Sequence, residues 1–289
     1  MIDVVVCVHN EEKYLEGCLK SIFNQTLKPH RVLVILDRCT DRSEEIARRF
    51  PVEIFRKEEA RWRNSYAENL QLGFDLLKND GCGYFAVVDA DVILPENYFN
   101  YMVFYMEQNK VVCASGYVED RPRKLLNRLI AAWKRFNLRF TPLGKRPRGC
   151  CMVIDKRRLK EIGGFTDVPA PDTYVQNEFL KRGYNVELVV NPTTVVQHVR
   201  DEPLRKILRK QFQTGVARHE LGTSFLRTLL HGIFRLRPLT ILGHIYAYYK
   251  KDKVEFALWI LALILFTWFL WWYIFKYIPL ALKNRLWNI

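Results

Sequence analysis

The sequence predicts an α/β protein built on a mixed, mostly parallel sheet with helices on both faces. Three observations support this fold class: apolar runs alternate with segments of helical periodicity, one run is apolar throughout, and polar clusters follow the runs. The fully apolar run, residues 84–88, has the composition of a central strand buried on both faces. It is followed by Asp89 and Asp91, which predicts that this strand ends at a polar site.

The first 120 residues are expected to alternate strands with helices. Apolar runs predict strands at 2–8, 31–36, 52–55, 84–88 and 111–118, and apolar residues at helical spacing predict helices at 13–25, 44–50, 64–79 and 97–108. In a parallel sheet covered on both faces, ligands bind beyond the carboxyl ends of the strands. The polar clusters lie at those ends, so we expect the functional site there.

The second part of the chain has a different character. Residues 121–148 combine an apolar stripe with a basic opposite face, which is typical either of an interfacial helix on anionic lipid or of an ordinary helix packed on the sheet. Further on, strands are expected at 151–154 and 186–196, helices at 157–162 and 172–182, and basic, apolar segments at 205–222 and 225–249.

Length and cysteine content limit the class of protein. A chain of 289 residues can hold one large domain or two, with an ample core. The seven cysteines are odd in number and include no Cys-x-x-Cys. This pattern argues against a disulfide framework and a structural zinc site, and it favours a reducing compartment.

Charge is divided unevenly along the chain. Residues 1–120 carry 14 Lys and Arg against 20 Asp and Glu, whereas residues 121–289 carry 31 against 11, a net charge of +20. Such asymmetry indicates an acidic partner, for which nucleic acid, anionic lipid and a phosphorylated substrate are candidates. No aromatic and basic recognition motif accompanies the charge, so we expect an anionic membrane and no nucleic acid.

A hydrophobic segment near the end of the chain predicts a membrane anchor. Residues 256–275 are 20 positions without a charge, long enough at about 1.5 Å per residue to cross a hydrocarbon core of roughly 30 Å. Trp268, Trp271 and Trp272 crowd one end, as an interfacial aromatic belt would. We expect a transmembrane helix at 256–278, with a buried core helix as the alternative. The larger basic cluster precedes it, which favours a catalytic part on the cytoplasmic face, and the start on a strand predicts no signal peptide.

The two acids after the central strand suit a metal. Asp89 and Asp91 are two residues apart, so in a continuing strand they would share a face. A hard divalent cation such as Mg²⁺ or Mn²⁺ prefers carboxylate oxygens and keeps open positions for phosphate oxygens. A strand that merely ends in a polar turn is the alternative, because aspartate is common there.

An ordered set of motifs resembles a known family. The set consists of residues 4–15, residues 19–25, Asp37-Arg38-Cys39-Thr40-Asp41, Ala67-Glu68-Asn69, Asp89-Ala90-Asp91, Gly163-Gly164-Phe165 and Arg182-Gly183-Tyr184. On these motifs, roughly residues 2–220 resemble a family-2 glycosyltransferase of the GT-A fold. The resemblance implies an enzyme of the hexosyltransferase type that uses a nucleotide diphosphate-sugar and Mn²⁺ or Mg²⁺.

The resemblance also implies roles for single residues. It assigns the nucleotide to Val8, His9, Glu11, Asp37 and Asp89, a basic position near the diphosphate to Arg63, and the metal to Asp89 and Asp91. A divalent cation would stabilise the diphosphate as negative charge gathers on it.

Asp172 corresponds to the general base of the family, counted back from Gly183-Tyr184. Pro171 stands where the family carries a glutamate, so a neighbour that would help set the pKa of Asp172 is absent. The alternative is that Asp172 caps the following helix. Asp172 serves both as base and as helix cap if the helix N-terminus keeps its carboxylate ionised.

Two later residues bear on the reaction. His198 follows a late strand, where it is expected either to complete the metal shell or bind phosphate, or to be a structural histidine. Gln211 alone remains of the Gln-x-x-Arg-Trp motif that processive synthases of this family carry, which argues against processive synthesis.

Together these features predict an inverting, metal-dependent glycosyltransferase that acts at a membrane on a lipid-linked or saccharide acceptor. An alternative acceptor is a polyprenyl phosphate, as in synthases of dolichol-phosphate sugars; it is already ionised, so Asp172 would be dispensable. A non-enzymatic membrane or nucleic-acid-binding protein is a different class, as is a nucleotidyltransferase, whose glycine- and lysine-rich phosphate loop is missing after the first strand.

The predicted organisation follows the same order. It comprises a nucleotide-sugar-binding half at 1–120, an acceptor-binding half with the basic amphipathic helix at 121–222, basic interfacial helices at 223–255, the transmembrane helix at 256–278 and a tail at 279–289.

Overall fold

The computed structural model describes residues 1–79, 81–120, 146–199, 204–235 and 237–251, with single residues at 125, 128, 129, 132, 136 and 268. The chain divides into two compact units, Met1–Ile207 and Leu208–Ile289. Nearly all of the predicted interfacial helix at 121–148 and of the predicted transmembrane helix at 256–278 lies outside the described residues. No helix within the described ranges is long and apolar enough to cross a membrane. The domain boundaries drawn at 120, 222 and 255 stay a prediction.

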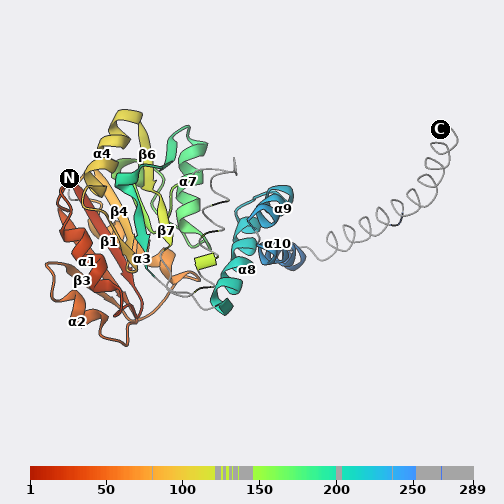
Figure 1. Ribbon diagram of the computed structural model, residues 1–289, viewed down its shortest axis with the longest axis horizontal. Helices are drawn as coiled ribbons and strands as arrows, with labels where there is room; N and C mark the ends of the chain where they lie inside the picture. Colours follow the sequence, from red (N-terminus) through yellow and green to blue (C-terminus); the bar gives the residue numbers. More distant parts are fainter. Residues whose placement is uncertain are drawn as a thin grey trace. The chain divides into compact units, whose positions relative to one another are not determined.

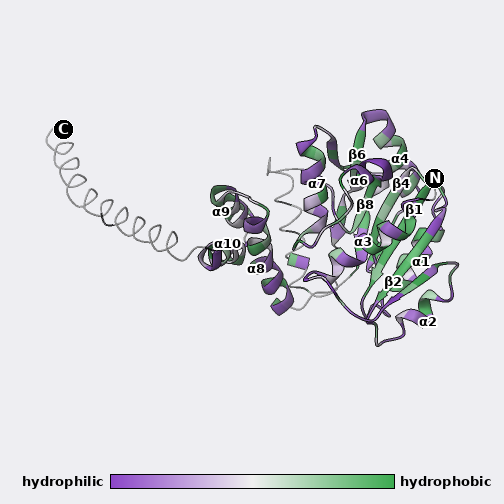
Figure 2. Ribbon diagram, turned by 180° about the vertical axis from the view of Figure 1, so that it is seen from behind, coloured by the Kyte–Doolittle hydropathy of each residue, from purple (hydrophilic) through white to green (hydrophobic). Residues whose placement is uncertain are grey.

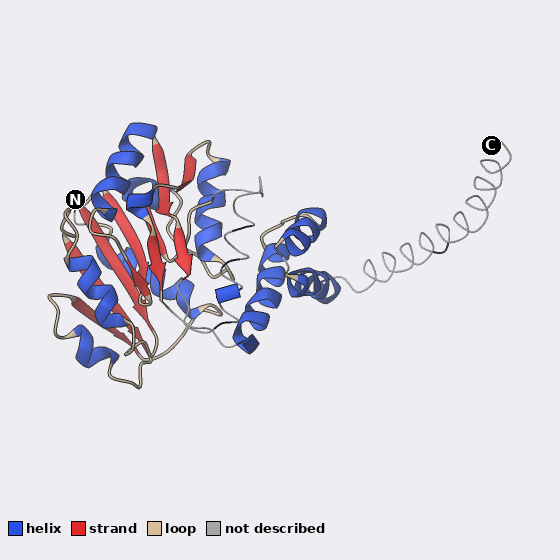
Figure 3. Ribbon diagram, viewed as in Figure 1, coloured by secondary structure: helices blue, strands red, loops and turns tan. Residues whose placement is uncertain are grey.

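Strands and helices alternate through the first unit (Figure 1, Figure 3). The strands are β1 (Ile2–Val8), β2 (Arg31–Asp37), β3 (Glu53–Lys57), β4 (Tyr84–Asp89), β5 (Val92–Ile93), β6 (Val111–Gly116), β7 (Val118–Asp120), β8 (Cys151–Asp155), β9 (Asn185–Val189) and β10 (Val196–His198). The helices are α1 (Leu15–Phe23), α2 (Ser43–Ala47), α3 (Ser65–Leu77), α4 (Tyr98–Asn109), α6 (Lys156–Glu161) and α7 (Pro171–Lys181), with a short 3₁₀ turn η1 (Pro192–Thr194). Later in the chain come α8 (Leu204–Glu220), α9 (Phe225–Phe234) and α10 (Pro238–Lys251).

The main sheet has seven strands in the order β3-β2-β1-β4-β8-β6-β9. All neighbours are parallel except that β8 runs antiparallel to both β4 and β6. The predicted class, a mixed and mostly parallel α/β sheet, is therefore confirmed. A small second sheet, β5-β10-β7, joins segments that are distant in sequence.

Alternating side chains of the central strands fill two hydrophobic cores, one on each face of the sheet. On β1, Val4, Val6 and Val8 pack with α1, α2 and α4, whereas Val5 packs with α3, α6 and α7. Helices on both faces explain why the central strands are apolar almost throughout (Figure 2). The sheet is thereby a rigid base for the loops at its edge.

Two predicted strands are divided in the structure. The strand expected at 111–118 breaks into β6 and β7 at Tyr117, whose carbonyl accepts from the N–H of Val196 at 2.8 Å. The strand expected at 186–196 becomes β9 and β10, separated by η1. Pro192 explains this second break, because proline has no N–H for a sheet hydrogen bond.

Candidate active site

The carboxyl ends of β2, β1 and β4 lie side by side. Their register pairs Val8 with Leu36 and Cys7 with Asp89, so the loops after the three strands leave the sheet at one edge. The strand order β2-β1-β4 makes this a topological switch point, where open α/β sheets bind ligands. The polar residues after these strands therefore lie at one edge, and the binding of a ligand there stays a prediction.

The loops after β1 and β2 are joined by hydrogen bonds. The Asn10 side-chain oxygen accepts from the N–H of Thr40 at 2.8 Å, and the N–H of Glu12 donates to Asp41 at 2.9 Å. Asn10 has a φ of 58°, in the left-handed region that asparagine tolerates better than most residues. The two loops therefore hold a defined shape next to each other.

Four predicted nucleotide contacts come together here. Val8 is the buried last residue of β1, and Nδ1 of the exposed His9 lies 2.6 Å from the backbone oxygen of Asp37. The N–H of Glu11 donates to the Ser43 hydroxyl at 2.9 Å, which ties the first loop to the start of α2. The structure thus brings Val8, His9, Glu11 and Asp37 to one edge, and their contacts with a nucleotide stay a prediction.

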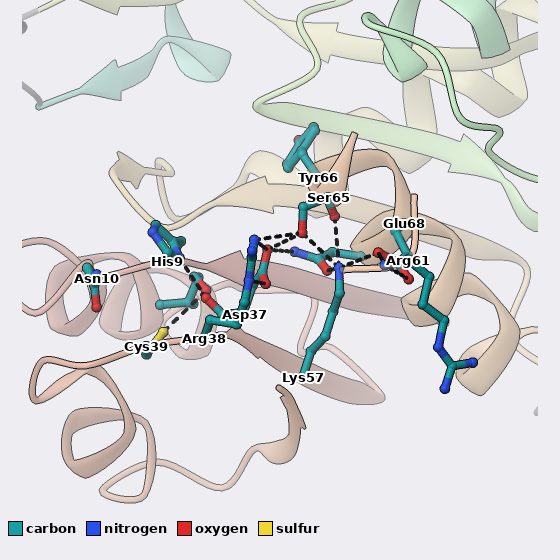
Figure 4. A network of polar contacts seen from close by, with 12 residues as sticks. His9, Asn10, Asp37, Arg38, Cys39, Lys57, Arg61, Ser65, Tyr66 and Glu68 are labelled. Atoms are coloured by element: carbon teal, nitrogen blue, oxygen red, sulfur yellow. Dashed lines mark hydrogen bonds and ion pairs between the residues drawn. The ribbon is translucent and has the colours of Figure 1, made fainter. Parts of the chain in front are cut away.

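The carboxylate of Asp37 is the centre of a polar network (Figure 4). Arg38 Nε donates to one oxygen at 2.7 Å, while Ser65 Oγ and Asn69 Nδ2 donate to the other at 2.6 and 3.1 Å. Burial by itself would raise the pKa of Asp37, but these hydrogen bonds and the charge of Lys57 outweigh it and hold the pKa below its ordinary value. Asp37 is therefore a firmly ionised hydrogen-bond acceptor.

Lys57 forms the cationic part of this network, and the motifs in the sequence do not reveal it. Its ammonium lies 2.7 Å from a carboxylate oxygen of Glu68 and donates to Asn69 at 2.7 Å and to Ser65 at 2.8 Å. Glu68 in turn accepts from the N–H of Arg61 at 3.0 Å. Lys57 is only 7% exposed, so a buried ion pair fixes β3, α3 and the intervening loop around Asp37.

Asp89 ends β4 beside Tyr66, a contact that sequence reasoning missed. The Tyr66 hydroxyl donates to Asp89 Oδ1 at 3.0 Å, and the N–H of Asp89 donates to the carbonyl of Cys150 at 2.9 Å. Asn64 caps α3 by accepting from the N–H of Tyr66 at 3.1 Å, which fixes the start of that helix. Burial and the charge of Asp91 raise the pKa of Asp89 to about 6, although the Tyr66 hydrogen bond acts against them.

Asp91 does not continue the strand. The chain turns at residues 90 and 91, so Asp89 and Asp91 do not share a face of β4, contrary to the expectation for a continuing strand. The turn brings Asp91 to β10 instead, where His198 Nε2 lies 3.2 Å from Asp91 Oδ2. Pairing of His198 with Val92 in the small sheet produces this contact. The predicted proximity of His198 to the acidic pair is thus present.

The chemistry of the acidic pair fits a hard divalent cation. Both carboxylates are at least partly buried, and each charge is close enough to affect the other, as the raised pKa of Asp89 records. A bound cation would relieve this repulsion, and carboxylate oxygens are the donors that Mg²⁺ and Mn²⁺ prefer. Asp89, Asp91 and His198 are therefore the residues that would hold the metal.

Within the described residues, a tighter group of three potential metal ligands lies elsewhere. One ligand atom each of Asp3, His30 and Cys82 lies within 4.8 Å of the others. The group sits at the amino end of β1, away from the carboxyl edge. The ammonium of Lys156 bonds to Asp3 there, and a positive charge at that point competes with a cation. We therefore regard Asp3 as the partner of Lys156 in a buried ion pair between β1 and α6.

Asp172 lies in the first turn of α7. The N-cap is Ala170 and the helix begins at Pro171, so Asp172 is not the N-cap that the alternative interpretation required. Burial raises its pKa and outweighs the N–H groups of the first turn and the charge of Arg148. Desolvation is therefore the larger effect on the pKa of Asp172, and the helix N-terminus opposes it.

Asp172 and Asp89 approach each other across the segment that precedes β8. A Cβ added at Gly149 would lie 2.8 Å from Asp172 Oδ2, so the glycine backbone packs directly on the carboxylate. The next residue, Cys150, accepts the hydrogen bond from Asp89. The charge of Asp172 also contributes to the raised pKa of Asp89. The structure therefore brings Asp172 near Asp89 and Asp91, and a shared role of the three acids stays a prediction.

Arg63 is exposed on the loop that leads into α3. Its N–H and that of Asn64 donate to the two carboxylate oxygens of Asp167, each at 2.9 Å. The Asn64 side chain also donates to the carbonyl of Val168 at 2.7 Å. These bonds tie the loop that carries Arg63 to the loop before Asp172, a link across about a hundred residues that no local motif reveals.

The fold is a mostly parallel α/β sheet, covered on both faces, with acids at its carboxyl edge. Residues 3–161, more than half of the chain, match the family described as Glycosyl transferase family 2. The chain therefore belongs to this family and is a glycosyltransferase.

Curated relatives carry the same class of name. An uncharacterized glycosyltransferase of Haemophilus influenzae is 33% identical over 125 residues, which is 40% of this chain and 36% of that protein. Glycosyltransferase GlyA of Streptococcus pneumoniae is 34% identical over 102 residues, 34% of this chain and 14% of that protein. The matched region is thus about a third or less of these relatives.

Solved structures share the fold over more of the chain. One is the mannosyltransferase PcManGT from Pyrobaculum calidifontis, in complex with GDP-Man and Mn²⁺. It has a TM-score of 0.56 at 19% identity, and the match covers 99% of this chain and 87% of the mannosyltransferase chain. Another is glucosyl-3-phosphoglycerate synthase from Mycobacterium tuberculosis, in complex with Mn²⁺, UDP-Glc and phosphoglyceric acid. It has a TM-score of 0.56 at 18% identity, and the match covers 78% of this chain and 80% of the synthase chain. At such identities the likeness is one of fold.

Proposed function

We propose that this protein transfers a sugar, with inversion, from a nucleotide diphosphate-sugar to an acceptor, using Mn²⁺ or Mg²⁺. The observation that supports this best is the meeting of Asp89, Asp91 and Asp172 beside the Asp37 network at one edge of the sheet. Two neighbours in fold, with sugar nucleotides and Mn²⁺ in their complexes, agree with the proposal.

The nucleotide would lie along the ends of β2 and β1. Asp37 offers an ionised acceptor to a base N–H, and His9 and Glu11 flank it on the neighbouring loop. Arg63, exposed on the loop before α3, is the cation we assign to the diphosphate. Val8 closes the floor of this region as the buried end of β1.

The leaving diphosphate would meet the acidic pair. A divalent cation held by Asp89 and Asp91 supplies charge stabilisation for the diphosphate as the sugar departs. The Tyr66 hydroxyl bonds to one oxygen of Asp89, so we assign the other oxygen to the cation. His198 orients Asp91 and is the further ligand or phosphate contact that we propose.

Asp172 would act as the general base. It takes the proton from the acceptor hydroxyl as that oxygen attacks the anomeric carbon from the face opposite the diphosphate, which gives inversion. Its raised pKa suits this task, because a base works best when its pKa lies nearer the working pH. Gly149 leaves room for the carboxylate in this position.

The acceptor we propose is lipid-linked or a saccharide, and it is met at a membrane with the catalytic unit on the cytoplasmic side. The net charge of +20 after residue 120 and the uncharged stretch 256–275 support a membrane location. A phosphate acceptor, as on a polyprenyl phosphate, remains the competing proposal, and it would leave Asp172 without a proton to accept.

The test is release of nucleoside diphosphate from a panel of nucleotide sugars by the purified protein. One donor should be hydrolysed with Mn²⁺ or Mg²⁺ and not after chelation with EDTA, and that donor identifies base and sugar together. Asp75→Asn, which alters an exposed acid on α3, is the matched control for Asp89→Asn. Turnover that survives EDTA, or the absence of turnover with every donor and acceptor, would contradict the proposal.

A further inference from the structure

The helical unit formed by residues 208–251 buries small and polar side chains. Large aliphatic and aromatic residues are absent from the buried set of its described helices. That set is Gly215 and Ala217 of α8, Thr228 and Gly232 of α9, and Thr240, Gly243, His244 and Ala247 of α10. An interior of this kind removes little apolar area from water, so the hydrophobic effect gives it little stability.

Glycines bring the helix backbones into contact in this unit. A Cβ added at Gly215 would lie 2.0 Å from the carbonyl oxygen of Thr240, and one at Gly243 would lie 2.0 Å from that of Phe212. A Cβ at Gly232 would lie 2.4 Å from the side chain of Ile241. Close backbone approach through small residues is how helices associate in lipid, where apolar side chains gain nothing by facing one another.

Many large apolar side chains of this unit are exposed, whereas others, such as Phe212, Ile241 and Ile245, are half-buried. The exposed ones are Leu208 on α8, Phe225, Leu226, Leu230, Ile233 and Phe234 on α9, and Leu242, Tyr246 and Tyr249 on α10. On α9 the exposed Leu226, Leu230 and Ile233 recur at helical spacing and form one stripe, whereas Thr228 and Gly232 are buried. An exposed apolar surface of this extent indicates a partner.

Charge identifies that partner. Between residues 208 and 251 there are eight Lys and Arg against one acidic residue, Glu220. A protein partner of matching shape would need a strongly acidic rim, whereas an anionic bilayer offers acyl chains and negative headgroups together. Among the helices described between residues 204 and 251, the longest, α8, has 17 residues, or about 26 Å, less than a hydrocarbon core of roughly 30 Å.

We propose that the unit 208–251 lies on an anionic lipid bilayer, with the α9 stripe of Leu226, Leu230 and Ile233 in the acyl boundary and the basic residues among the headgroups. The inference rests on the proposed function in one respect, because it assigns the membrane-binding surface of that enzyme. It names a surface distinct from the uncharged stretch 256–275, since these helices lie along the membrane and do not cross it.

An environment-sensitive fluorescent amino acid tests the depth of single positions in the full chain. It is placed singly at Leu226, Ile233 or Phe104, and the protein is reconstituted into phosphatidylcholine vesicles with and without phosphatidylglycerol. Phe104 is the matched control because it is a large apolar side chain, 60% exposed, on α4 of the first unit, against 63% for Leu226. Brominated acyl chains in the vesicles quench only fluorophores that reach the acyl boundary.

We expect emission at 226 and 233 to shift to the blue and to lose most of its intensity to brominated lipid, more so with phosphatidylglycerol, while position 104 is unchanged. Equal quenching at all three positions would overturn the proposal. A blue shift without quenching would also overturn it, because a second copy of the chain or another protein would then cover the stripe. Neither readout needs sugar transfer, so a failed donor assay leaves this test intact. The double variant Arg227→Glu with Arg235→Glu should reduce the additional quenching that phosphatidylglycerol causes.

Discussion

The two units of this protein bury opposite kinds of side chain. The first unit encloses its largest residues, Tyr98, Phe85, Phe99 and Phe179 among them, on two faces of a sheet. The helical unit 208–251 encloses glycine, alanine, threonine and histidine and exposes leucine and phenylalanine. The hydrophobic effect thus accounts for the packing of the first unit, whereas the second unit needs another source of stability, for which we propose contact with lipid.

The largest expected effect concerns the acids of the first unit. Asp89→Asn or Asp91→Asn should nearly abolish transfer, because stabilisation of the leaving group by a cation is worth several kcal/mol, on the order of 10³-fold or more in rate. Turnover is measured as nucleoside diphosphate release, with a melting curve to show that the fold is intact. Asp75→Asn should behave as the unaltered protein. Near-normal turnover of either site variant would remove the acidic pair from the mechanism.

The next effect concerns the base. Asp172→Asn should lower turnover by about 10²- to 10⁴-fold with little change in donor binding. Gly149→Ala should reproduce part of this loss, since its Cβ would crowd the Asp172 carboxylate. Equal loss of donor affinity would make Asp172 structural, and undiminished turnover would favour a phosphate acceptor.

Replacing Tyr66 should have a smaller effect than replacing Asp172, and the effect should be on metal-dependent nucleotide binding. Tyr66→Phe removes a hydrogen bond to a charged oxygen, typically about 1.5–3 kcal/mol, and should weaken metal-dependent nucleotide binding by roughly 10-fold or more. Tyr84→Phe removes a similar bond to Glu107 near the other end of β4 and is the control. If both variants bind metal and nucleotide alike, Tyr66 does not position Asp89.

A substitution in the helical unit should disrupt its packing without altering the candidate active site of the first unit. Gly243→Leu places a large side chain against the backbone of α8 and should destabilise the unit 208–251 by about 1–3 kcal/mol or more. Limited proteolysis should then cut this unit sooner, while donor hydrolysis by the first unit persists. Gly83→Ala, with open space around the added Cβ, is the control. Unchanged proteolysis would show that close glycine contact does not hold these helices together.

The last prediction concerns the dependence of stability on pH. Burial lowers the pKa of His231 to about 3 and that of His244 to about 4, against an ordinary 6.5. The folded unit keeps both rings neutral while the unfolded chain protonates them, so stability is complete above pH 6.5 and falls as the pH drops from 6.5 toward 4. Urea unfolding of the full chain at pH 7 and pH 5 measures this. His231→Gln with His244→Gln should flatten the dependence, and an unchanged slope would contradict it.

The sheet and its polar edge could be predicted from the sequence because the patterns that indicate them are local. Apolar runs, helical spacing and the acids after residue 88 do not depend on distant contacts. Patterns could not predict the Tyr66 bond to Asp89 or the Asp167 tie to Arg63, which join residues 23 and 104 apart in sequence. Periodicity also shows that α9 has two faces without showing which is buried. Only packing reveals that Thr228 faces inward and Leu226 outward.

The most direct test of the metal site is a titration of Mn²⁺ followed by electron paramagnetic resonance, in the presence of the nucleoside diphosphate of the identified donor. The protein should remove the signal of one free Mn²⁺ per chain, and Asp89→Asn and Asp91→Asn should abolish this binding while His30→Ala with Cys82→Ser leaves it unchanged. Binding that survives the aspartate variants and is lost with the His30 and Cys82 changes would place the metal at the opposite end of β1 and contradict the proposed site.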